Sequence, residues 1–130
     1  VINEKNETVT VFRPQKPKYD YDTILKHCYI GCLTAMYDKE KLGLVTMPTK
    51  AVKREDFACW LSILKRGINA ECLAEDLATY RLHSSSVSAN KFKLIKYQWN
   101  VYRKVEKFNF FKCLYYMAHW AIKGFLKYKK

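Results

Sequence analysis

The sequence predicts an all-α fold, an up-and-down bundle of about five helices preceded by an extended N-terminal arm, and three observations lead to it. The 130 residues are 49% hydrophobic and 28% charged, with only four glycines and three prolines, as is typical of one packed globular domain. Apolar residues recur at helical spacing in several segments. No uninterrupted apolar run reaches the roughly 18 residues of a membrane-spanning helix.

The domain boundary is expected near residue 21. Residues 1–21 contain Pro14 and Pro17, and proline both fixes its own φ and disfavours helix at the residue before it. This segment is therefore predicted to be an extended arm, and residues 22–130 are predicted to form a single helical-bundle domain. The chain starts at Val1 rather than Met, which favours either a mature product cut from a precursor or an engineered start.

The first two helices are expected on either side of an irregular stretch, residues 39–48. Asp22 is a suitable N-cap, and the apolar residues behind it predict a helix that runs to about Asp38. A second helix is expected to begin after Thr49 and to end near Gly67. Its inward face consists of Phe57, Trp60, Leu61 and Leu64.

Three more helices are predicted in the remaining sequence. A short amphipathic helix follows Asn69 and ends near Tyr80, and a fourth, around residues 93–107, has an apolar side opposite a basic ridge. Asn109 is expected to cap the fifth helix, which is apolar or aromatic over most of its circumference. Because so wide an apolar face needs a large cover, we expect this helix to be central; apolar surface left exposed would instead mark a binding site.

The positive charge is concentrated in the last third of the chain. The formal net charge is +12, and residues 84–130 contain 11 basic residues and one acidic residue. The same region, from Phe92 to Tyr128, holds 12 of the 20 aromatic residues. A cationic, aromatic surface favours phosphate, in nucleic acid or in lipid headgroups, or an acidic protein partner.

Catalytic and metal-binding motifs are weak in this sequence. The five cysteines and three histidines contain only one close pair of thiols, Cys28-x-x-x-Cys32, whereas zinc sites usually show paired ligands at tighter spacing. We find no nucleophile turn, phosphate loop or carboxylate-rich motif. The prediction is therefore a non-enzymatic protein with no catalytic residues, no metal and no cofactor. If the chain is secreted, five cysteines close at most two disulfides and leave one thiol.

A membrane surface suits the basic and aromatic residues better than nucleic acid does, because no helix-turn-helix or RNA-binding signature accompanies them. Lysine and arginine attract anionic headgroups, and aromatic rings enter the interface. The predicted anion-binding residues are Lys93, Lys96, Arg103, Lys104, Lys107, Lys112, Lys123 and Lys127. The predicted inserting residues are Trp99, Tyr115, Tyr116, Trp120 and Phe125.

The chain resembles a known family at the level of pattern. Five helices in this order, the basic excess, Met36-Tyr37-Asp38-Lys39 ending the first helix, and Val101 to Val105 leading into the aromatic segment Phe108 to Tyr116 are similar to the abalone sperm lysin family, which includes a fusagenic acrosomal protein. The resemblance implies a secreted protein of the sperm acrosomal vesicle that acts in fertilization without catalysis. It would bind egg-coat glycoprotein or perturb membranes during gamete fusion. The sequence leaves undecided whether it forms a homodimer.

Two other hypotheses fit the same residues. A viral matrix or nucleocapsid-type helical module, processed from a polyprotein, would also be basic and helical; it would bind nucleic acid or anionic membrane inside a cell or a virion. A subunit of a larger complex would dock its basic face on an acidic partner. The state of the cysteines separates secretion from an intracellular location, because disulfides form and persist in oxidising compartments.

Overall fold

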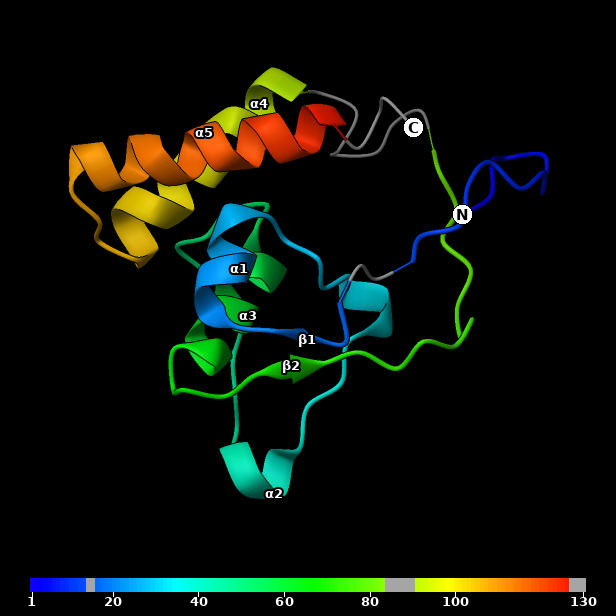
Figure 1. Cartoon of the computed structure of the whole chain (residues 1–130), viewed down its shortest axis with the longest axis horizontal. Helices are drawn as coiled ribbons and strands as arrows, with labels where there is room; N and C mark the ends of the chain where they lie inside the picture. Colours follow the sequence, from blue (N-terminus) through cyan, green and yellow to red (C-terminus); the bar gives the residue numbers. More distant parts are fainter. Residues whose placement is uncertain (14–15, 84–90, 127–130) are drawn as a thin grey trace.

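The computed structural model describes residues 1–13, 16–83 and 91–126, apart from the side chains of residues 91, 125 and 126. Its largest helical unit is made of α4 (Lys91–Asn100), a π-helical turn (Val101–Val105) and α5 (Phe110–Leu126). These elements pack against one another as an antiparallel pair at one edge of the molecule (Figure 1). We call residues 91–126 the α4–α5 hairpin.

Beneath the hairpin lie the two helices that complete the core. Helix α1 (Tyr21–Lys26) contacts both α5 and α3 (Glu55–Leu64), so it lies between the hairpin and α3. The main core joins side chains from all of these elements: Tyr19, Ile24, Leu25, Ala51, Phe57, Ala58, Leu61, Leu64, Val101, Tyr102, Phe108, Cys113 and Tyr116. The hairpin is therefore held to the rest of the molecule by one shared apolar core.

The remaining elements are short. Strand β1 (Lys18–Tyr19) pairs antiparallel with β2 (Ala70–Glu71), with Lys18 opposite Glu71 and Tyr19 opposite Ala70. Helix α2 (Lys39–Leu42) forms a single turn at the end of the molecule opposite the hairpin (Figure 1), and a 3-10 turn covers Cys32–Thr34. Long stretches without regular structure connect these elements.

Helix α1 is much shorter than the helix predicted over residues 22–38, which is wrong beyond Lys26. Asp20, rather than Asp22, caps its start, because the Asp20 side chain accepts a hydrogen bond from the Thr23 N–H at 2.8 Å. The helix ends where His27 adopts an extended backbone. The chain then continues extended, and the Tyr29 ring stacks on Tyr19 with centroids 4.9 Å apart. Stacking on the strand replaces the helical packing that the apolar spacing indicated.

Helix α3 confirms the inward face predicted for the second helix. Phe57, Trp60, Leu61 and Leu64 are all buried. The helix begins at Glu55 instead of just after Thr49, because two turns precede it, in which the N–H of Ala51 bonds to the carbonyl of Pro48 and that of Arg54 to the carbonyl of Ala51. Gly67 follows the helix with a φ of 82°, a left-handed conformation that glycine adopts without steric cost.

The predicted third helix is wrong, because the chain over residues 69–80 is extended. Ala70 and Glu71 pair with β1, and the Cys72 N–H donates to the Pro17 carbonyl at 2.8 Å. Leu73 and Leu77 are well exposed. Helical spacing indicates an amphipathic helix only when another surface covers the apolar side, and the described residues offer no such cover here.

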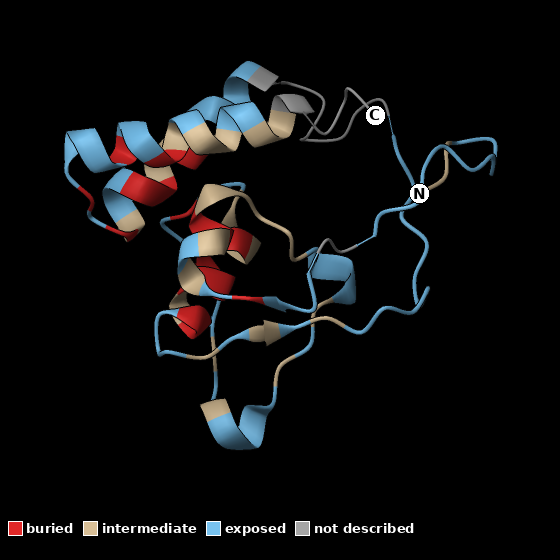
Figure 2. Cartoon of the chain, viewed as in Figure 1, coloured by how far each residue is buried: buried red, intermediate tan, exposed pale blue. Residues whose placement is uncertain are grey.

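The last two helices were located correctly, but α5 does not occupy the centre. The Asn109 side chain accepts from the Lys112 N–H at 2.8 Å, which confirms the predicted cap of α5. Figure 2 shows α5 at the edge, with exposed residues along its outer side. In the part of the chain that the structure describes, no helix combines the length and the hydropathy of a membrane span. The all-α class and the division into an arm over 1–21 and a domain over 22–130 stay predictions.

Candidate functional site

Glu106 is a buried carboxylate that is bound by two side chains of the fold, Lys65 and Tyr21. Its side chain is 4% exposed and lies 2.8 Å from the Lys65 ammonium, and it also accepts a hydrogen bond from the Tyr21 hydroxyl. Burial, followed by this hydrogen bond, raises the pKa of Tyr21 far above its usual value, so Tyr21 stays a donor. Because both partners are fixed by the fold, Glu106 serves to attach the hairpin to α1 and α3 rather than to meet a substrate.

Asp22 is a second carboxylate used for attachment. It accepts from the Tyr116 hydroxyl at 2.9 Å and from the Lys26 ammonium at 2.5 Å, which ties α1 to α5. The bond from Lys26, with a smaller contribution from Tyr116, lowers the pKa of Asp22. Burial and the bond to Asp22 raise the pKa of Tyr116. Tyr116 therefore remains protonated and cannot accept a proton at neutral pH.

The start of α3 presents two neighbouring carboxylates, Glu55 and Asp56, that are not tied to any cation among the described residues. The Glu55 carboxylate accepts from the Lys53 N–H at 3.0 Å and so supports the left-handed turn at Lys53. One oxygen of Asp56 accepts from the Phe57 N–H at 2.7 Å. Asp56 is half-buried, so its carboxylate is neither sealed in the core nor fully exposed to solvent.

Arg54 precedes these carboxylates and is held in place from the hairpin. Its guanidinium donates twice to Gln98 Oε1, from Nε at 3.0 Å and from Nη2 at 2.5 Å. Its guanidinium carbon also lies 5.0 Å from the centroid of the Phe57 ring. Gln98 is fully buried, so it fixes Arg54 more firmly than a mobile surface partner would. The first turn of α3 thus combines an oriented cation with two carboxylates, and we call Arg54, Glu55 and Asp56 the α3 start.

The basic residues predicted to bind anions do not gather at the α3 start. Lys93, Lys96, Lys104 and Lys107 are exposed on the hairpin. Three others are partly used within the fold: Arg103 donates to the Phe108 carbonyl at 2.6 Å, Lys112 lies over the Phe108 ring, and half-buried Lys123 lies over Tyr29. Lys127 lies outside the described residues. Their role as an anion-binding set stays a prediction.

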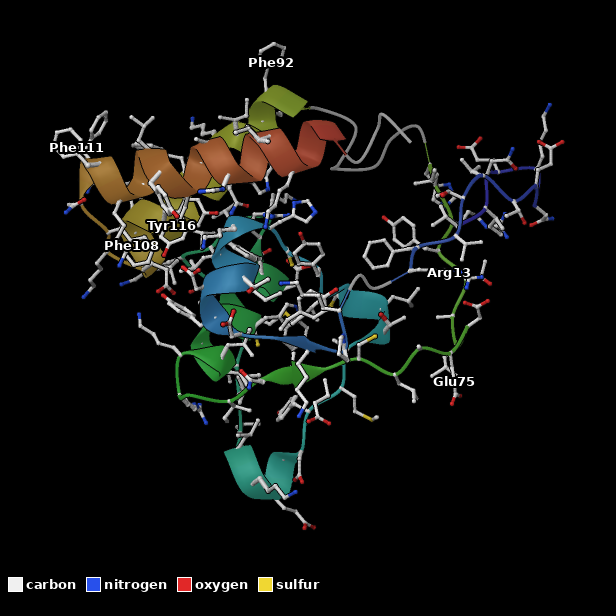
Figure 3. The ribbon with its side chains drawn as sticks, in the orientation of Figure 1. Arg13, Glu75, Phe92, Phe108, Phe111 and Tyr116 are labelled. Atoms are coloured by element: carbon white, nitrogen blue, oxygen red, sulfur yellow. The ribbon has the colours of Figure 1, made fainter. Side chains whose placement is uncertain are left out.

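The predicted inserting residues do not share one surface. Tyr116 is buried and points toward α1, alongside Phe108 (Figure 3). Trp99 packs partly buried against the core, with its ring 5.7 Å from that of Phe110, and Trp120 is half-buried. Tyr115 is half exposed, and the side chain of Phe125 lies outside the described residues. Among the described side chains of this set, only Tyr115 is exposed.

The cysteines give no support to thiol chemistry. Cys28 lies beyond the end of α1, so Cys28 and Cys32 do not share a helix, as they would in the helix predicted to run to about Asp38. Cys59 and Cys113 are buried, and burial raises the pKa of both thiols, whereas a nucleophilic cysteine needs a lowered pKa. Among the described residues, no three His, Cys, Asp or Glu side chains come close enough to hold a metal ion.

Comparison with known proteins shows that the homologues of this chain are bacterial glycosyltransferases. The teichuronic acid biosynthesis glycosyltransferase TuaG of Bacillus subtilis is 45% identical over 101 residues, which is 78% of this chain and 40% of TuaG. Two Escherichia coli proteins, WfaP and WfgD, are each named as a UDP-Glc:alpha-D-GlcNAc-diphosphoundecaprenol beta-1,3-glucosyltransferase. WfaP is 35% identical over 96% of this chain, and WfgD is 36% identical over 98%.

The chain spans less than half of the length of these relatives, covering 49% of both WfaP and WfgD. A scan of protein-family models gives no match. No solved structure matches either. The evidence for the relationship to these glycosyltransferases is therefore the sequence identity along most of this chain.

These relatives overturn the sperm-protein hypothesis. The resemblance to the lysin family, the roles in fertilization and gamete fusion, and the placement in an acrosomal vesicle are wrong, because the homologues are bacterial. The viral alternative, with a virion or host-cell location, fails for the same reason. The partners expected from the sequence, an anionic membrane surface or egg-coat glycoprotein and, under the viral alternative, nucleic acid, are wrong as well: the names of WfaP and WfgD give a nucleotide sugar and a lipid-linked sugar as the substrates of those proteins. The prediction of a non-enzyme is also wrong, because the named homologues are enzymes.

The pattern-level resemblance failed because its features are not specific. Helix order, basic excess and aromatic content recur in many unrelated proteins. The sequence did contain a better signal, the adjacent acids Glu55 and Asp56 directly before the apolar face of the second predicted helix. Two carboxylates next to a buried helix face are candidates for acid–base chemistry, although they form no longer carboxylate-rich motif.

Proposed function

We propose that this chain is part of a bacterial glycosyltransferase that transfers a sugar from a nucleoside-diphosphate donor to a lipid-diphosphate-linked sugar acceptor. One observation carries the proposal: WfaP and WfgD, both named for a reaction of this kind, align with 96% and 98% of this chain at 35% and 36% identity. The name of TuaG, teichuronic acid biosynthesis, supports the same setting of bacterial surface polysaccharide.

The chemistry of such a transfer requires a base. A hydroxyl oxygen of the acceptor sugar forms a bond to the anomeric carbon of the donor, while the bond from that carbon to the diphosphate oxygen breaks. The nucleoside diphosphate leaves with the electron pair, and the acceptor hydroxyl loses its proton. A carboxylate within hydrogen-bond reach of that hydroxyl speeds the step by typically about 10²–10⁴-fold.

Asp56 is the carboxylate that we assign to this role. Among the described acidic residues, Asp22, Asp38, Glu71 and Glu106 are held in ion pairs with lysines. Glu55 supports the turn at Lys53. Asp56 is half-buried on the first turn of α3, a helix with seven buried residues, and it forms no ion pair among the described residues. A rigid support and partial burial suit a general base.

Arg54, which precedes Glu55 in the sequence as Asp56 follows it, supports the proposed transfer at this site. Its guanidinium is oriented by Gln98 and by the Phe57 ring. An oriented guanidinium is well suited to bind diphosphate, and both substrates named for WfaP and WfgD contain one. The proposed roles are therefore a proton acceptor at Asp56 and a diphosphate contact at Arg54, both at the α3 start.

A direct transfer assay tests the proposal on the full-length product of the gene that carries this sequence. The protein is incubated with radiolabelled UDP-glucose and a short-chain GlcNAc-diphospholipid acceptor, and the products are separated and identified by mass spectrometry. We expect the wild type to transfer glucose or, with a panel of nucleoside-diphosphate sugars, another hexose. Asp56→Asn should lower kcat by about 10²-fold or more with little change in KM, because the base acts only in the transition state.

The matched control is Glu40→Gln, which removes an exposed carboxylate on α2, at the opposite end of the molecule. It should keep wild-type kcat. A folded wild-type protein that neither transfers nor hydrolyses any sugar of the panel would contradict the proposed function. An Asp56→Asn enzyme with unchanged kcat would leave transfer in place and refute the assignment of the base.

A further inference from the structure

Helix α4 buries a glutamine rather than an apolar residue. Among the described side chains of α4, residues 92–100, only Gln98 belongs to the buried class, and it is 0% exposed. Phe92 and Ile95 of the same helix are exposed instead. A buried amide costs free energy unless it is hydrogen-bonded. The partner of Gln98 therefore decides what this residue does in the protein.

That partner is Arg54, and the contact uses one edge of its guanidinium group. Nε and Nη2, which share this edge, both donate to Gln98 Oε1. A guanidinium has five N–H donors, and the hydrogen bonds of the described residues leave both N–H groups of Nη1 and the second one of Nη2 unused. We call these three the Nη1 edge. Because Arg54 is only half-buried, the Nη1 edge can bind two oxygens of a phosphate group in the bidentate manner.

Arg54 is held differently from the other cations of the fold. Arg66, Arg81 and Arg103 donate to backbone carbonyls, which are part of the chain whatever the neighbouring side chains are. The guanidinium of Arg54 is instead held by a side chain from another element, 44 residues further along the chain, and by the Phe57 ring beneath it. The α4–α5 hairpin thus fixes the orientation of a cation at the α3 start.

The contact orients Arg54 without cancelling its charge. Gln98 is neutral, and no carboxylate of the described residues forms an ion pair with Arg54. The hairpin does use a carboxylate for its other contact of this kind, because Glu106 pairs with Lys65. A carboxylate would hold a guanidinium more strongly than an amide does, so a purely structural contact would gain from one. The neutral partner indicates that the positive charge of Arg54 is kept for a ligand.

We propose that Gln98 is a positioning residue for the sugar transfer: its neutral carbonyl fixes Arg54 so that the Nη1 edge, with its full charge, binds the diphosphate of a substrate. The inference rests on the proposed function and deepens it. Gln98 does not touch the substrate and acts through Arg54. The donor and the acceptor in the names of WfaP and WfgD both contain a diphosphate, and the experiment below distinguishes the two sources.

Gln98→Glu is the sharpest test, because it keeps the oxygen acceptor for Arg54 and adds a negative charge. The full-length product of the gene is assayed for transfer while UDP-glucose and the short-chain GlcNAc-diphospholipid acceptor are varied in turn. Gln98→Glu should stay folded and raise the KM for one of the two substrates by about tenfold, because Arg54 is then neutralised. We expect a smaller change in kcat. The substrate whose KM rises is the one whose diphosphate Arg54 binds.

Three further variants separate positioning from stability. Gln98→Met keeps the length of the side chain without an acceptor, so Arg54 must be ordered on binding, and the same KM should rise about threefold. In an Arg54→Ala background Gln98→Met should cause no further rise, because Gln98 acts only through Arg54. The matched control, Tyr116→Phe, removes another hydrogen bond of the hairpin, the one to Asp22, and should keep both KM values. Circular dichroism verifies that each variant is folded, and if Gln98→Met is not, Gln98→Glu alone decides.

The two proposals fail separately in these experiments. If the wild type transfers sugar and folded Gln98→Glu keeps both KM values, the positioning role is overturned and the proposed function stands. A rise with Gln98→Met that persists in the Arg54→Ala background would also overturn it. If the wild type transfers no sugar, the proposed function fails, and calorimetric titration of UDP and of the acceptor in the same buffer decides on Gln98. Equal binding of both ligands by wild type and Gln98→Glu, or no binding by the wild type, would refute the positioning role.

Discussion

Exposed apolar side chains are arranged differently in the hairpin and in the loops on the other side of the molecule. On α5 they form one stripe on one helix, surrounded by lysines. On residues 31–47 and 70–83, which we call the irregular region, they lie on loops and on the 3-10 turn Cys32–Thr34, and acidic residues such as Glu40, Glu71 and Glu75 lie among them. The packing of Cys113 and Tyr116 in the core fixes α5 and with it the outer side of the helix, whereas the irregular region has no buried residue to fix its side chains.

The irregular region contains exposed Leu33, Met36, Leu44, Leu73 and Leu77. None of its residues is buried, whereas the inner side of α5 belongs to the main core. Substitutions in the core that joins the hairpin to α1 and α3 are therefore expected to cost far more stability than substitutions in the irregular region.

Tyr102→Ala is expected to have the largest effect, because Tyr102 joins the hairpin to α1 and α3. The side chain is fully buried, its ring contacts those of Phe57, Phe108 and Tyr116, and its hydroxyl donates to the Leu25 carbonyl at 2.5 Å. Truncating a buried aromatic residue costs about 3–5 kcal/mol of unfolding free energy. Denaturant unfolding followed by circular dichroism measures the loss.

A comparison variant, Tyr102→Phe, separates packing from hydrogen bonding. It keeps the ring and leaves the buried Leu25 carbonyl without its donor, at a cost of about 1–3 kcal/mol. Should Tyr102→Ala lower the unfolding free energy by no more than Tyr102→Phe, the hairpin would not depend on its packing against α1 and α3.

Lys65→Met is expected to have an intermediate effect. It removes the cation from the buried Glu106 carboxylate and leaves only the Tyr21 hydroxyl as its partner. Breaking a fully buried ion pair costs about 3–5 kcal/mol, but the Lys65 side chain is 55% exposed, so we expect about 1–2 kcal/mol. The double variant Lys65→Met, Glu106→Gln should regain part of the loss, because no unpaired charge stays buried. If the double variant is less stable than the single one, the pair is not the reason for the effect.

Sequence reasoning succeeded where local signals and burial agree. Asn109 begins α5, and the four inward residues of α3 are buried as predicted. It failed over residues 27–38 and 69–80, where helical spacing was present but the chain forms no α-helix. In both cases a contact with Tyr19 of β1 takes precedence: the Tyr29 ring stacks on the Tyr19 ring, and Ala70 of β2 pairs with Tyr19 in the sheet. Such contacts join residues far apart in the sequence, and local periodicity carries no information about them.

The candidate site shows the same division. The anion-binding lysines could be located on exposed surface from their arc on a helical wheel, and Lys93, Lys96 and Lys104 lie there. Tyr116 could not be separated from Tyr115 by type, although one is buried against Asp22 and the other half exposed. The pairing of Arg54 with Gln98 spans 44 residues, so the orientation of the α3 start follows from tertiary packing alone.

The smallest effect is expected from the irregular region itself. Leu73→Ser and Leu77→Ser replace side chains that are 65% and 68% exposed, so each should change the unfolding free energy of this 130-residue chain by no more than about 0.5 kcal/mol. Leu61→Ser is the matched reference, because the same substitution in the core of α3 should cost several-fold more. In the full-length product of the gene, a cover over the irregular region would make Leu73→Ser and Leu77→Ser strongly destabilising. An effect that stays near zero there would show that these leucines face solvent, and the irregular region would then need no protein partner.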